Sequence, residues 1–337
     1  MISLKKVTIK DIAERAGVSP ATVSRVLNHE EGVSKEVAEK VMKIAKEMNY
    51  SFNLNAKILR SGKSRIIGII IPDIANSFFA KVLYGIQSVL QPLNYKILLT
   101  NTEENPKLEE EYVKTFMDYG VDGVLSAPTR NMNKKVYLDL LNSQIPIVFF
   151  DRKIPEIKVS SVILDNEGAI EKAVGYLVQN GHRRIGFVSG IKEIYTGELR
   201  EKGFINSLKK YNLDPKNCPI YKGQFSETEA ERAATEMLTN HDITAIVCSN
   251  NKTTVGVLRA IKSLKLLLQE DISIIGFDLE SWSELLEISI IYQPQFSIGM
   301  ICAQRLLREI DNVSLEAENI VLSPELIIRN SVKNLIC

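Results

Sequence analysis

The spacing of apolar positions changes along the chain and separates a short front segment from a long remainder. In residues 8–28, "TIKDIAERAGVSPATVSRVLN", apolar side chains recur every three or four residues on both sides of Gly17. This spacing predicts two short amphipathic helices joined by a tight turn, with Thr8 and Ser19 as N-caps. A third, longer helix is predicted after Ser34, so the front segment should form a three-helix unit.

The second predicted helix has two different faces. Val23, Val26 and Leu27 fall on the side that should pack inward. The outward side carries small residues, hydroxyls and one arginine: Ala21, Thr22, Ser24 and Arg25. Such a surface allows close approach to a duplex, hydrogen bonds to phosphates and bidentate contact with a guanine edge. A plain helical bundle with no DNA partner is the alternative.

From residue 65 onward, short β-branched runs alternate with amphipathic helical stretches. The runs are "RIIGIIIPD", "YKILLTN", "DGVLSAP", "IPIVFFD", "SSVILDN", "RRIGFVSG", "AIVCSN" and "ISIIGFD". Continuous apolar strands separated by helices predict buried parallel sheets with helices on both faces, and this many strands need two sheets. The repeat of an apolar run ending in Phe-Asp, at 145–151 and 272–278, suggests duplication of one lobe.

Charge is distributed unevenly along the 337 residues. Residues 1–63 carry 12 Lys/Arg against 7 Asp/Glu, whereas the rest carries 30 against 34. The basic front segment is compatible with a polyanionic partner, although a solvated surface would account for an excess of this size equally well.

Several function classes are disfavoured by missing motifs. The histidines are confined to positions 29, 182 and 241, and there is no G-x-G-x-x-G, Walker loop, G-x-S-x-G or H-E-x-x-H. The cysteines, at 218, 248, 302 and 337, lack metal-site or disulfide-framework spacing. We therefore expect no catalytic residue, no metal and no cofactor. The start lacks a signal peptide and no apolar run approaches about 18 residues, so a cytoplasmic location is expected.

The front segment closely resembles the DNA-binding segment of the lactose/galactose repressor family of bacterial transcription regulators, and the resemblance continues through nearly the whole chain. It implies a recognition helix at 19–27, with Pro20, Ala21 and Arg25 at base-reading positions and Ser19, Thr22 and Ser24 at phosphate-contacting ones. The full set of DNA-contacting residues implied is Thr8, Ser19, Pro20, Ala21, Thr22, Ser24, Arg25, Asn28, Asn53, Ala56, Lys57 and Leu59.

Residues 51–63 are predicted to form a linker with a short helix at 53–60. In the family this hinge helix pairs with its dimer mate in the minor groove and inserts a leucine, here Leu59, between base pairs. Phe52, Lys57 and Ile58 stand where proline, arginine and serine are usual, which places the hinge geometry in question.

The resemblance also implies the fold class: a small all-α helix–turn–helix domain followed by two doubly wound parallel-sheet α/β lobes like those of periplasmic binding proteins. We expect the DNA-binding domain at 1–50, the hinge at 51–63 and the core at 64–337. The first lobe should span about 64–158 and 293–320, the second about 159–292 and 321–337. The three crossings are then expected near Val159, Tyr292 and Val321.

Polar residues that follow parallel strands are the candidates for binding a ligand, because ligands sit beyond the carboxyl ends of such strands. With the family positions, the candidates are Asp73, Asn76, Phe78, Phe79, Asp151, Arg152, Arg200, Phe225, Asn250, Asn251, Asp278 and Gln293. Carboxylates, arginine and amides can bridge neighbouring hydroxyls, and aromatic faces can cover a sugar ring. Alone, the Phe78–Phe79 pair is more typical of core, and Asp151–Arg152 of a surface pair. Asn251 replaces an aspartate usual in the family.

These features together predict a sequence-specific repressor controlled by a small ligand, most simply a sugar, bound between the lobes. Its expected partners are double-stranded operator DNA, the effector and a second copy of the chain; no membrane partner is expected. The alternatives are control by a phosphorylated partner protein, a cytosolic sugar-binding protein, or an enzyme. For the dimer surface, the expected helices at 77–90 and 295–310 offer Val82, Ile86, Leu307 and Ile310, which fit a core equally well. No leucine heptad follows the last strand, which favours a dimer over a tetramer.

Overall fold

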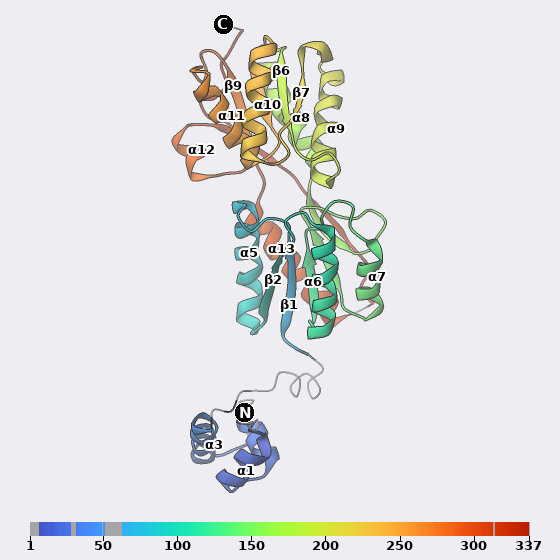
Figure 1. Cartoon of the computed structure of the whole chain (residues 1–337), viewed down its shortest axis with the longest axis vertical. Helices are drawn as coiled ribbons and strands as arrows, with labels where there is room; N and C mark the ends of the chain where they lie inside the picture. Colours follow the sequence, from blue (N-terminus) through green and yellow to red (C-terminus); the bar gives the residue numbers. More distant parts are fainter. Residues whose placement is uncertain (1–6, 28–31, 49, 51–62, 313, 337) are drawn as a thin grey trace, which may run out of the picture. The chain divides into compact units, whose positions relative to one another are not determined.

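The computed structural model describes residues 7–27, 32–48, 50, 63–312 and 314–336 (Figure 1). The chain separates into two compact units, Met1–Ser64 and Arg65–Cys337. They are called the N-terminal unit and the core unit, and each is described by itself.

The N-terminal unit contains three helices: α1 (Ile9–Ala16), α2 (Pro20–Leu27) and α3 (Lys35–Glu47). Thr8 and Asp11 form the predicted capping box, and Gly17 ends α1 in the left-handed conformation. Ser19 accepts the backbone N–H of Thr22, as expected of a cap for α2.

One small apolar core holds these helices together. Ile12 of α1, Val23 of α2 and Val41 of α3 are fully buried in it. This is the three-helix arrangement predicted from the apolar spacing.

The first lobe of the core unit is a six-stranded parallel sheet with strand order β11-β5-β4-β3-β1-β2. Helices α5 and α13 pack on one face, and α6 and α7 on the other. Its strands are β1 (Ile66–Ile71), β2 (Lys96–Asn101), β3 (Gly123–Ser126), β4 (Ile147–Phe150), β5 (Ser160–Leu164) and β11 (Asn319–Leu322), and its helices are α5 (Ser77–Leu90), α6 (Pro106–Tyr119), α7 (Lys134–Asn142) and α13 (Gln295–Asp311).

The second lobe has a six-stranded sheet with order β12-β10-β9-β8-β6-β7, parallel except for the β10–β12 pair. Helices α8 and α9 cover one face, and α10 and α11 the other. Its strands are β6 (Ile185–Ser189), β7 (Ile220–Lys222), β8 (Ala245–Cys248), β9 (Ser273–Phe277), β10 (Ser289–Tyr292) and β12 (Glu325–Ile327), and its helices are α8 (Asn166–Gln179), α9 (Tyr195–Lys210), α10 (Glu227–Asn240), α11 (Asn251–Ser263) and α12 (Ser281–Leu285).

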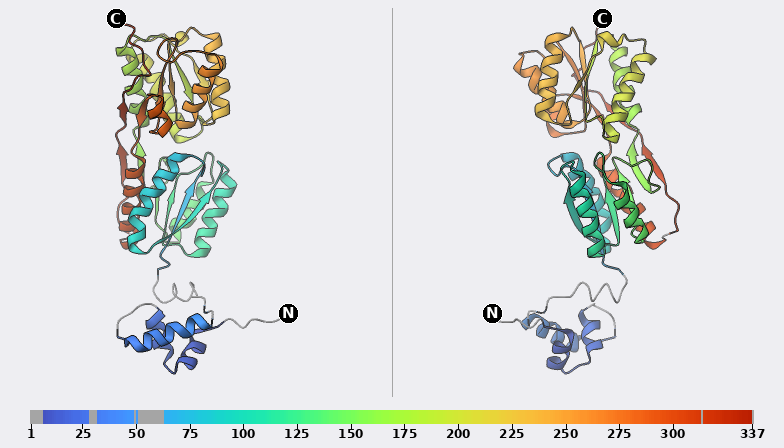
Figure 2. Two further views of the ribbon diagram at one scale, coloured as in Figure 1. Left: turned by 90° about the vertical axis from the view of Figure 1, so that its left-hand side faces the viewer. Right: turned by 45° about the vertical axis from the view of Figure 1, so that its right-hand side comes forward.

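The two sheets have the same internal order, which matches the duplication suggested by the sequence. Strand β4 has the same position in the first sheet as β9 has in the second. Asp151 follows β4, and Asp278 follows β9. Figure 2 shows the lobes as two separate layered bodies joined by connecting segments.

Two predicted boundaries move. The strand Ser160–Leu164 pairs with β4 and β11, so it belongs to the first sheet, and the first crossing follows Leu164 instead of lying near Val159. Val321 lies within β11, which is also a strand of the first sheet, so the third crossing follows Leu322. An apolar strand beside a crossing fits either lobe by composition, and its pairing decides its place.

Helices α5 and α13 touch backbone to backbone. A Cβ on Gly85 would lie 2.1 Å from the carbonyl oxygen of Phe296, and one on Gly299 would lie 2.0 Å from that of Val82. The dimer candidates Val82 and Ile86 are fully buried in this lobe, so their alternative role as core residues is the correct one. Leu307 and Ile310 are partly buried against the same core.

No helix within the described ranges combines the length and the apolar character needed to span a membrane.

Candidate effector-binding site and DNA-binding surface

A cavity of about 260 Å³ lies between the lobes, at the carboxyl ends of the strands of both sheets. It is lined by all twelve candidates named from the sequence: Asp73, Asn76, Phe78, Phe79, Asp151, Arg152, Arg200, Phe225, Asn250, Asn251, Asp278 and Gln293. They converge because parallel strands deliver their following loops to one edge of each sheet.

The wall formed by the first lobe centres on Arg152. Its Nη1 lies 2.8 Å from Oε1 of Glu104, and its Nε lies 3.3 Å from Oδ2 of Asp151. Asp151 and Arg152 are both buried, so the alternative of an ordinary surface pair is wrong. Burial raises the pKa of Asp151, and the positive charge of Arg152 opposes that rise.

The wall formed by the second lobe centres on Arg200, from the second turn of α9. Its Nε donates to Oδ1 of Asn166 at 2.7 Å, and its Nη1 donates to the carbonyl of Ser249 at 2.6 Å. The guanidinium carbon lies 4.0 Å from the centre of the Phe277 ring. Three elements thus fix the plane of the guanidinium group, which orients it for bidentate bonding.

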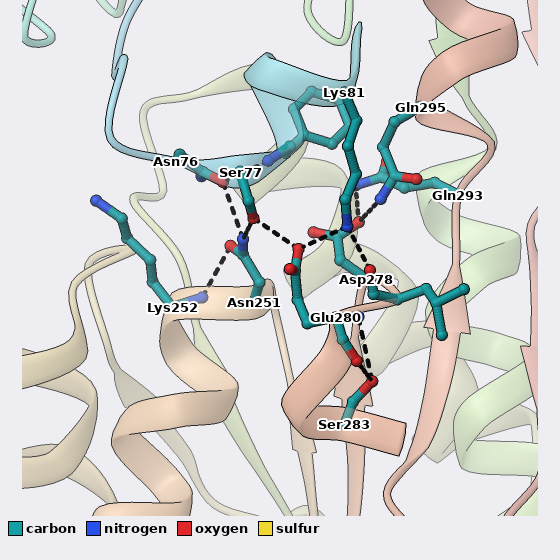
Figure 3. A network of polar contacts seen from close by, with 12 residues as sticks. Asn76, Ser77, Lys81, Asn251, Lys252, Asp278, Glu280, Ser283, Gln293 and Gln295 are labelled. Atoms are coloured by element: carbon teal, nitrogen blue, oxygen red, sulfur yellow. Dashed lines mark hydrogen bonds and ion pairs between the residues drawn. The ribbon is translucent and has the colours of Figure 1, made fainter. Parts of the chain in front are cut away.

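Asp278 is held by two glutamines. The Nε2 atoms of Gln293 and Gln295 donate to its Oδ1 at 2.7 and 2.9 Å, so its other oxygen is not engaged by either amide (Figure 3). Burial raises the pKa of Asp278 to about 6, opposed by the hydrogen bond from Gln293 and the charge of Arg200. A ligand hydroxyl that donates to the second oxygen would stabilise the ionised form.

Six residues of the cavity wall have left-handed backbone conformations. Their φ angles are 52° at Glu103, 56° at Glu104, 61° at Asp151, 54° at Gln224, 51° at Phe225 and 69° at Asp278. Aspartate tolerates this region, whereas a bulky aromatic residue there is an outlier that the surroundings must enforce. Residues held in this way concentrate at functional sites, and here they follow the ends of four strands, β2, β4, β7 and β9, and line one cavity.

Aromatic side chains line the cavity from both lobes. Phe78 and Phe79 are nearly fully buried in the first-lobe core and form an edge-to-face pair at 5.1 Å, so they are core residues with an edge at the cavity. Phe225 packs directly over Gly190, where a Cβ would lie 2.1 Å from its ring. Its ring is the aromatic surface that the second lobe contributes to the cavity.

The walls contain buried polar atoms that no described residue satisfies. Oε2 of Glu104 and Oε1 of Gln293 have no hydrogen-bond donor, and Nε of Arg152, although 3.3 Å from Oδ2 of Asp151, makes no hydrogen bond. Because a buried polar atom left unpaired costs free energy, this pattern suits a ligand that donates more hydrogen bonds than it accepts.

Asn251 lines the cavity and also bridges the two lobes. Its Nδ2 donates to Oδ1 of Asn76 at 2.9 Å and to Oγ of Ser77 at 3.0 Å, across the space between the lobes (Figure 3). Its Oδ1 accepts the backbone N–H of Lys252, whose ammonium pairs with Asp73. Asn251 lines the cavity, but its polar atoms join the two lobes.

The sequence analysis missed part of the lining. Pro72, Glu103, Glu104, Ile191, Thr196 and Gln224 also line the cavity. Glu103 and Glu104 closely follow the strand Lys96–Asn101, so the strand-end rule could have found them. Thr196 carries no comparable signal, because it lies within a helix.

The outward face of α2 is as predicted except at one position. Ser19, Pro20, Ala21 and Arg25 are exposed, and Thr22 is half-buried with its hydroxyl 2.9 Å from that of Ser19. Ser24 is only 9% exposed, so it does not lie on the outward face. Its side chain is short, and neighbouring side chains cover it.

Thr8 is exposed at the start of α1. The remaining predicted DNA contacts, Asn28, Asn53, Ala56, Lys57 and Leu59, lie outside the described residues, as does the expected hinge helix.

Within the described ranges, no three His, Cys, Asp or Glu side chains are grouped so that they could hold a metal ion.

Models of two protein families match the chain, one in each unit. The model "Periplasmic binding proteins and sugar binding domain of LacI family" matches residues 64–314, and "Bacterial regulatory proteins, lacI family" matches residues 8–53.

Individual relatives match over nearly their full length. The chain is 30% identical to the probable HTH-type transcriptional repressor ExuR of Bacillus subtilis (strain 168), covering 98% of this chain and 99% of that protein. It is 31% identical to the HTH-type transcriptional repressor PurR of Vibrio vulnificus (strain CMCP6), covering 97% and 99%. A crystal structure of the lac repressor dimer bound to operator and the anti-inducer ONPF superposes with a TM-score of 0.83 at 25% identity, covering 97% and 99%.

Proposed function

Because the chain belongs to the LacI family of bacterial transcription regulators, we propose that it represses transcription under the control of a small, uncharged, polyhydroxylated effector, most simply a monosaccharide. Family membership makes it a DNA-binding transcriptional repressor with an effector-binding core. The identity of the effector and the residues that bind it are the proposal.

The observation that carries the proposal is the composition of the cavity wall. Five carboxylates line it, from Asp73, Glu103, Glu104, Asp151 and Asp278, against two guanidinium groups, from Arg152 and Arg200. A phosphate or carboxylate on the ligand would add negative charge where burial already disfavours ionised carboxylates. Hydroxyl groups instead supply donors for the carboxylates and acceptors for the arginines.

The size of the cavity also supports a small ligand. Its volume of about 260 Å³ lies just below the range of roughly 300–1,000 Å³ typical of sites for drug-sized molecules. The position of the cavity between two lobes favours a metabolite over a protein partner as the signal. The match to a sugar-binding domain family points the same way.

For the DNA-binding step we propose that α2 enters the major groove. Arg25 is the exposed side chain of α2 able to make bidentate contact with a guanine, a contact contributing roughly 1–3 kcal/mol of discrimination. Ser19 and Thr22 are placed for phosphate contacts.

We further propose a homodimer that uses the exposed side of α5 and α13. Tyr84 and Phe296 are 68% and 40% exposed, with ring centres 5.6 Å apart. On α12, Leu285 is 84% exposed. Neighbouring exposed aromatic and apolar side chains are typical of protein interfaces, and the similar lac repressor structure is a dimer on its operator.

The proposed switch follows from differential binding. The effector stabilises one relative orientation of the lobes, and that orientation changes operator affinity. A hundredfold change needs about 2.7 kcal/mol of coupling between the two sites.

The test uses the full-length protein in two steps. Thermal shift is first measured with neutral pentoses and hexoses, their phosphates, uronic acids and purine bases. Duplexes are then selected from a random pool with and without the compound that binds. Binding of a neutral sugar that alters operator affinity supports the proposal. Binding of phosphates, acids or bases alone would overturn the effector class, and failure to select any duplex would overturn the repressor assignment.

A further inference from the structure

One loop of the second lobe is held by two helices of the first (Figure 3). The loop, residues 278–280, follows β9. The ammonium of Lys81 on α5 donates to the carbonyl of Leu279 and lies 3.0 Å from Oε1 of Glu280. The hydroxyl of Ser77, also on α5, donates to the same Glu280 oxygen at 2.6 Å.

The same loop contacts α13. Gln295, in the first turn of that helix, donates to Asp278 at 2.9 Å. Ser77, Lys81 and Gln295 together are called the latch residues. None of the three latch residues lines the cavity, but Asp278 does. Gln295 contacts Asp278 directly, and Ser77 and Lys81 contact the loop that carries Asp278.

Both sides of this contact are stiff. The loop continues into α12, where Ser283 accepts the backbone N–H of Glu280 at 3.2 Å and donates to its carbonyl at 2.7 Å. On the other side, α5 and α13 touch through Gly85 and Gly299, so neither helix can shift alone. The contact therefore joins two rigid parts, and it is either made or broken as a whole.

The contact between Lys81 and Glu280 is also partly shielded from solvent. The Glu280 side chain is 14% exposed and that of Lys81 is 39% exposed, so solvent screens this pair less than a surface pair. Asn251 makes a second bridge between the lobes through Asn76 and Ser77. An aspartate at 251, the usual residue of the resembled family, would have no hydrogen to donate to Asn76.

We propose that the latch residues are positioning residues that set effector affinity without touching the effector. They hold the 278–280 loop against α5 and α13, so that Asp278 faces the cavity in the orientation that binds. Effector binding and docking of the loop are then one linked equilibrium. The effector's role in this inference rests on the proposed function.

The first experiment measures effector affinity in full-length variants by calorimetry, with the sugar that binds the wild type. Lys81→Met keeps the aliphatic stem and removes the charge, and Glu280→Gln keeps the shape. Each is expected to weaken affinity roughly tenfold, within the range of conformational coupling energies. The double variant is expected to be no weaker than Lys81→Met, because Lys81→Met already removes the ion pair with Glu280.

A matched control is the exposed pair of Lys114 and Glu110 on α6, 2.7 Å apart. Lys114→Met and Glu110→Gln are expected to leave affinity within twofold of wild type. Unchanged affinity in Lys81→Met, or a double variant weakened by the product of the single effects, would overturn the latch.

A second measurement separates the latch from the proposed function, because it needs no ligand. The sequence has a single tryptophan, Trp282, two residues after the loop. Its emission without ligand is expected to shift in Lys81→Met and in Glu280→Gln, since each weakens the contact that docks the loop. Unchanged emission in both variants would overturn the latch, whereas failure of the wild type to bind any sugar would overturn only the proposed effector. If Lys81→Met does not fold, as judged by circular dichroism, Glu280→Gln alone decides.

Discussion

Replacing the buried carboxylate of Asp278 by the amide of Asn should stabilise the core unit at neutral pH and remove its response to the effector. Asn is nearly isosteric with Asp and also accepts the left-handed backbone found at this position, where φ is 69°. Its side-chain oxygen can still accept from Gln293 and Gln295. The main change is therefore the loss of a buried negative charge.

The magnitude follows from the pKa. The folded-state pKa of Asp278 is raised from 3.8 to about 6, so the folded protein holds its proton more tightly than the unfolded chain does. Wild-type stability consequently falls as pH rises from 3.8 through 6. One pKa unit corresponds to about 1.4 kcal/mol, so the cost reaches about 3 kcal/mol at pH 7.5 and about half of that at pH 5. The new amide nitrogen needs an acceptor, so the net gain at pH 7.5 is expected to be about 1–3 kcal/mol.

The assay is urea unfolding of the full-length protein, followed through the emission of Trp282 at pH 7.5 and pH 5. Asp278→Asn should raise the unfolding midpoint at pH 7.5, and the gain should shrink at pH 5. Glu110→Gln is the control, because hydrogen bonding to Lys114 lowers the pKa of that exposed carboxyl and its replacement should not stabilise. A gain that is absent at pH 7.5, or equal at both pH values, would refute the reasoning. The Asp278→Asn variant is also expected to bind operator DNA, and this binding should not change when the effector is added.

Four further changes test other parts of the molecule. Arg25→Ala should reduce preference for operator over random duplex by roughly 1–3 kcal/mol in a competition gel, whereas Thr22→Val, at a proposed phosphate contact on the same helix, should reduce affinity without changing preference. Arg200→Lys should weaken effector binding at least about tenfold in calorimetry, because a lysine cannot reproduce the planar, bidentate group. Gly85→Ala should destabilise the core by more than about 2 kcal/mol in urea unfolding, since its Cβ would overlap a backbone carbonyl. Tyr84→Glu should convert a dimer to a monomer in sedimentation analysis, and an unchanged mass would place the dimer surface elsewhere.

The sequence predicted the cavity lining well because one geometric rule covers most of it. The carboxyl ends of parallel strands meet at one edge, so residues such as Asp151 and Asp278, which end apolar runs, had to converge. The same rule would have found Glu103 and Glu104. Thr196 escaped because a residue inside a helix shows no sign in the sequence that it faces a cavity.

The errors have a common physical origin in tertiary packing. Ser24 has the polarity of a surface residue, but neighbouring side chains cover it. Val82 and Ile86 suited a dimer surface by composition, but close contact between two helices, permitted by Gly85, turned them into core. The strand Ser160–Leu164 was assigned to the wrong lobe because its composition does not show which strands it pairs with, here Ile147–Phe150 and Asn319–Leu322.

The left-handed positions in the cavity wall carry a consequence for redesigning this protein as a biosensor. At Asp151 and Asp278 the backbone favours Asn and Gly besides Asp, so most other residues in a library that randomises these codons would add about 1–2 kcal/mol of backbone strain. Arg152 and Gln293 do not have left-handed backbones and carry unsatisfied polar atoms in the cavity. Specificity for a new metabolite should therefore be sought first at those two positions, with the aspartates left in place.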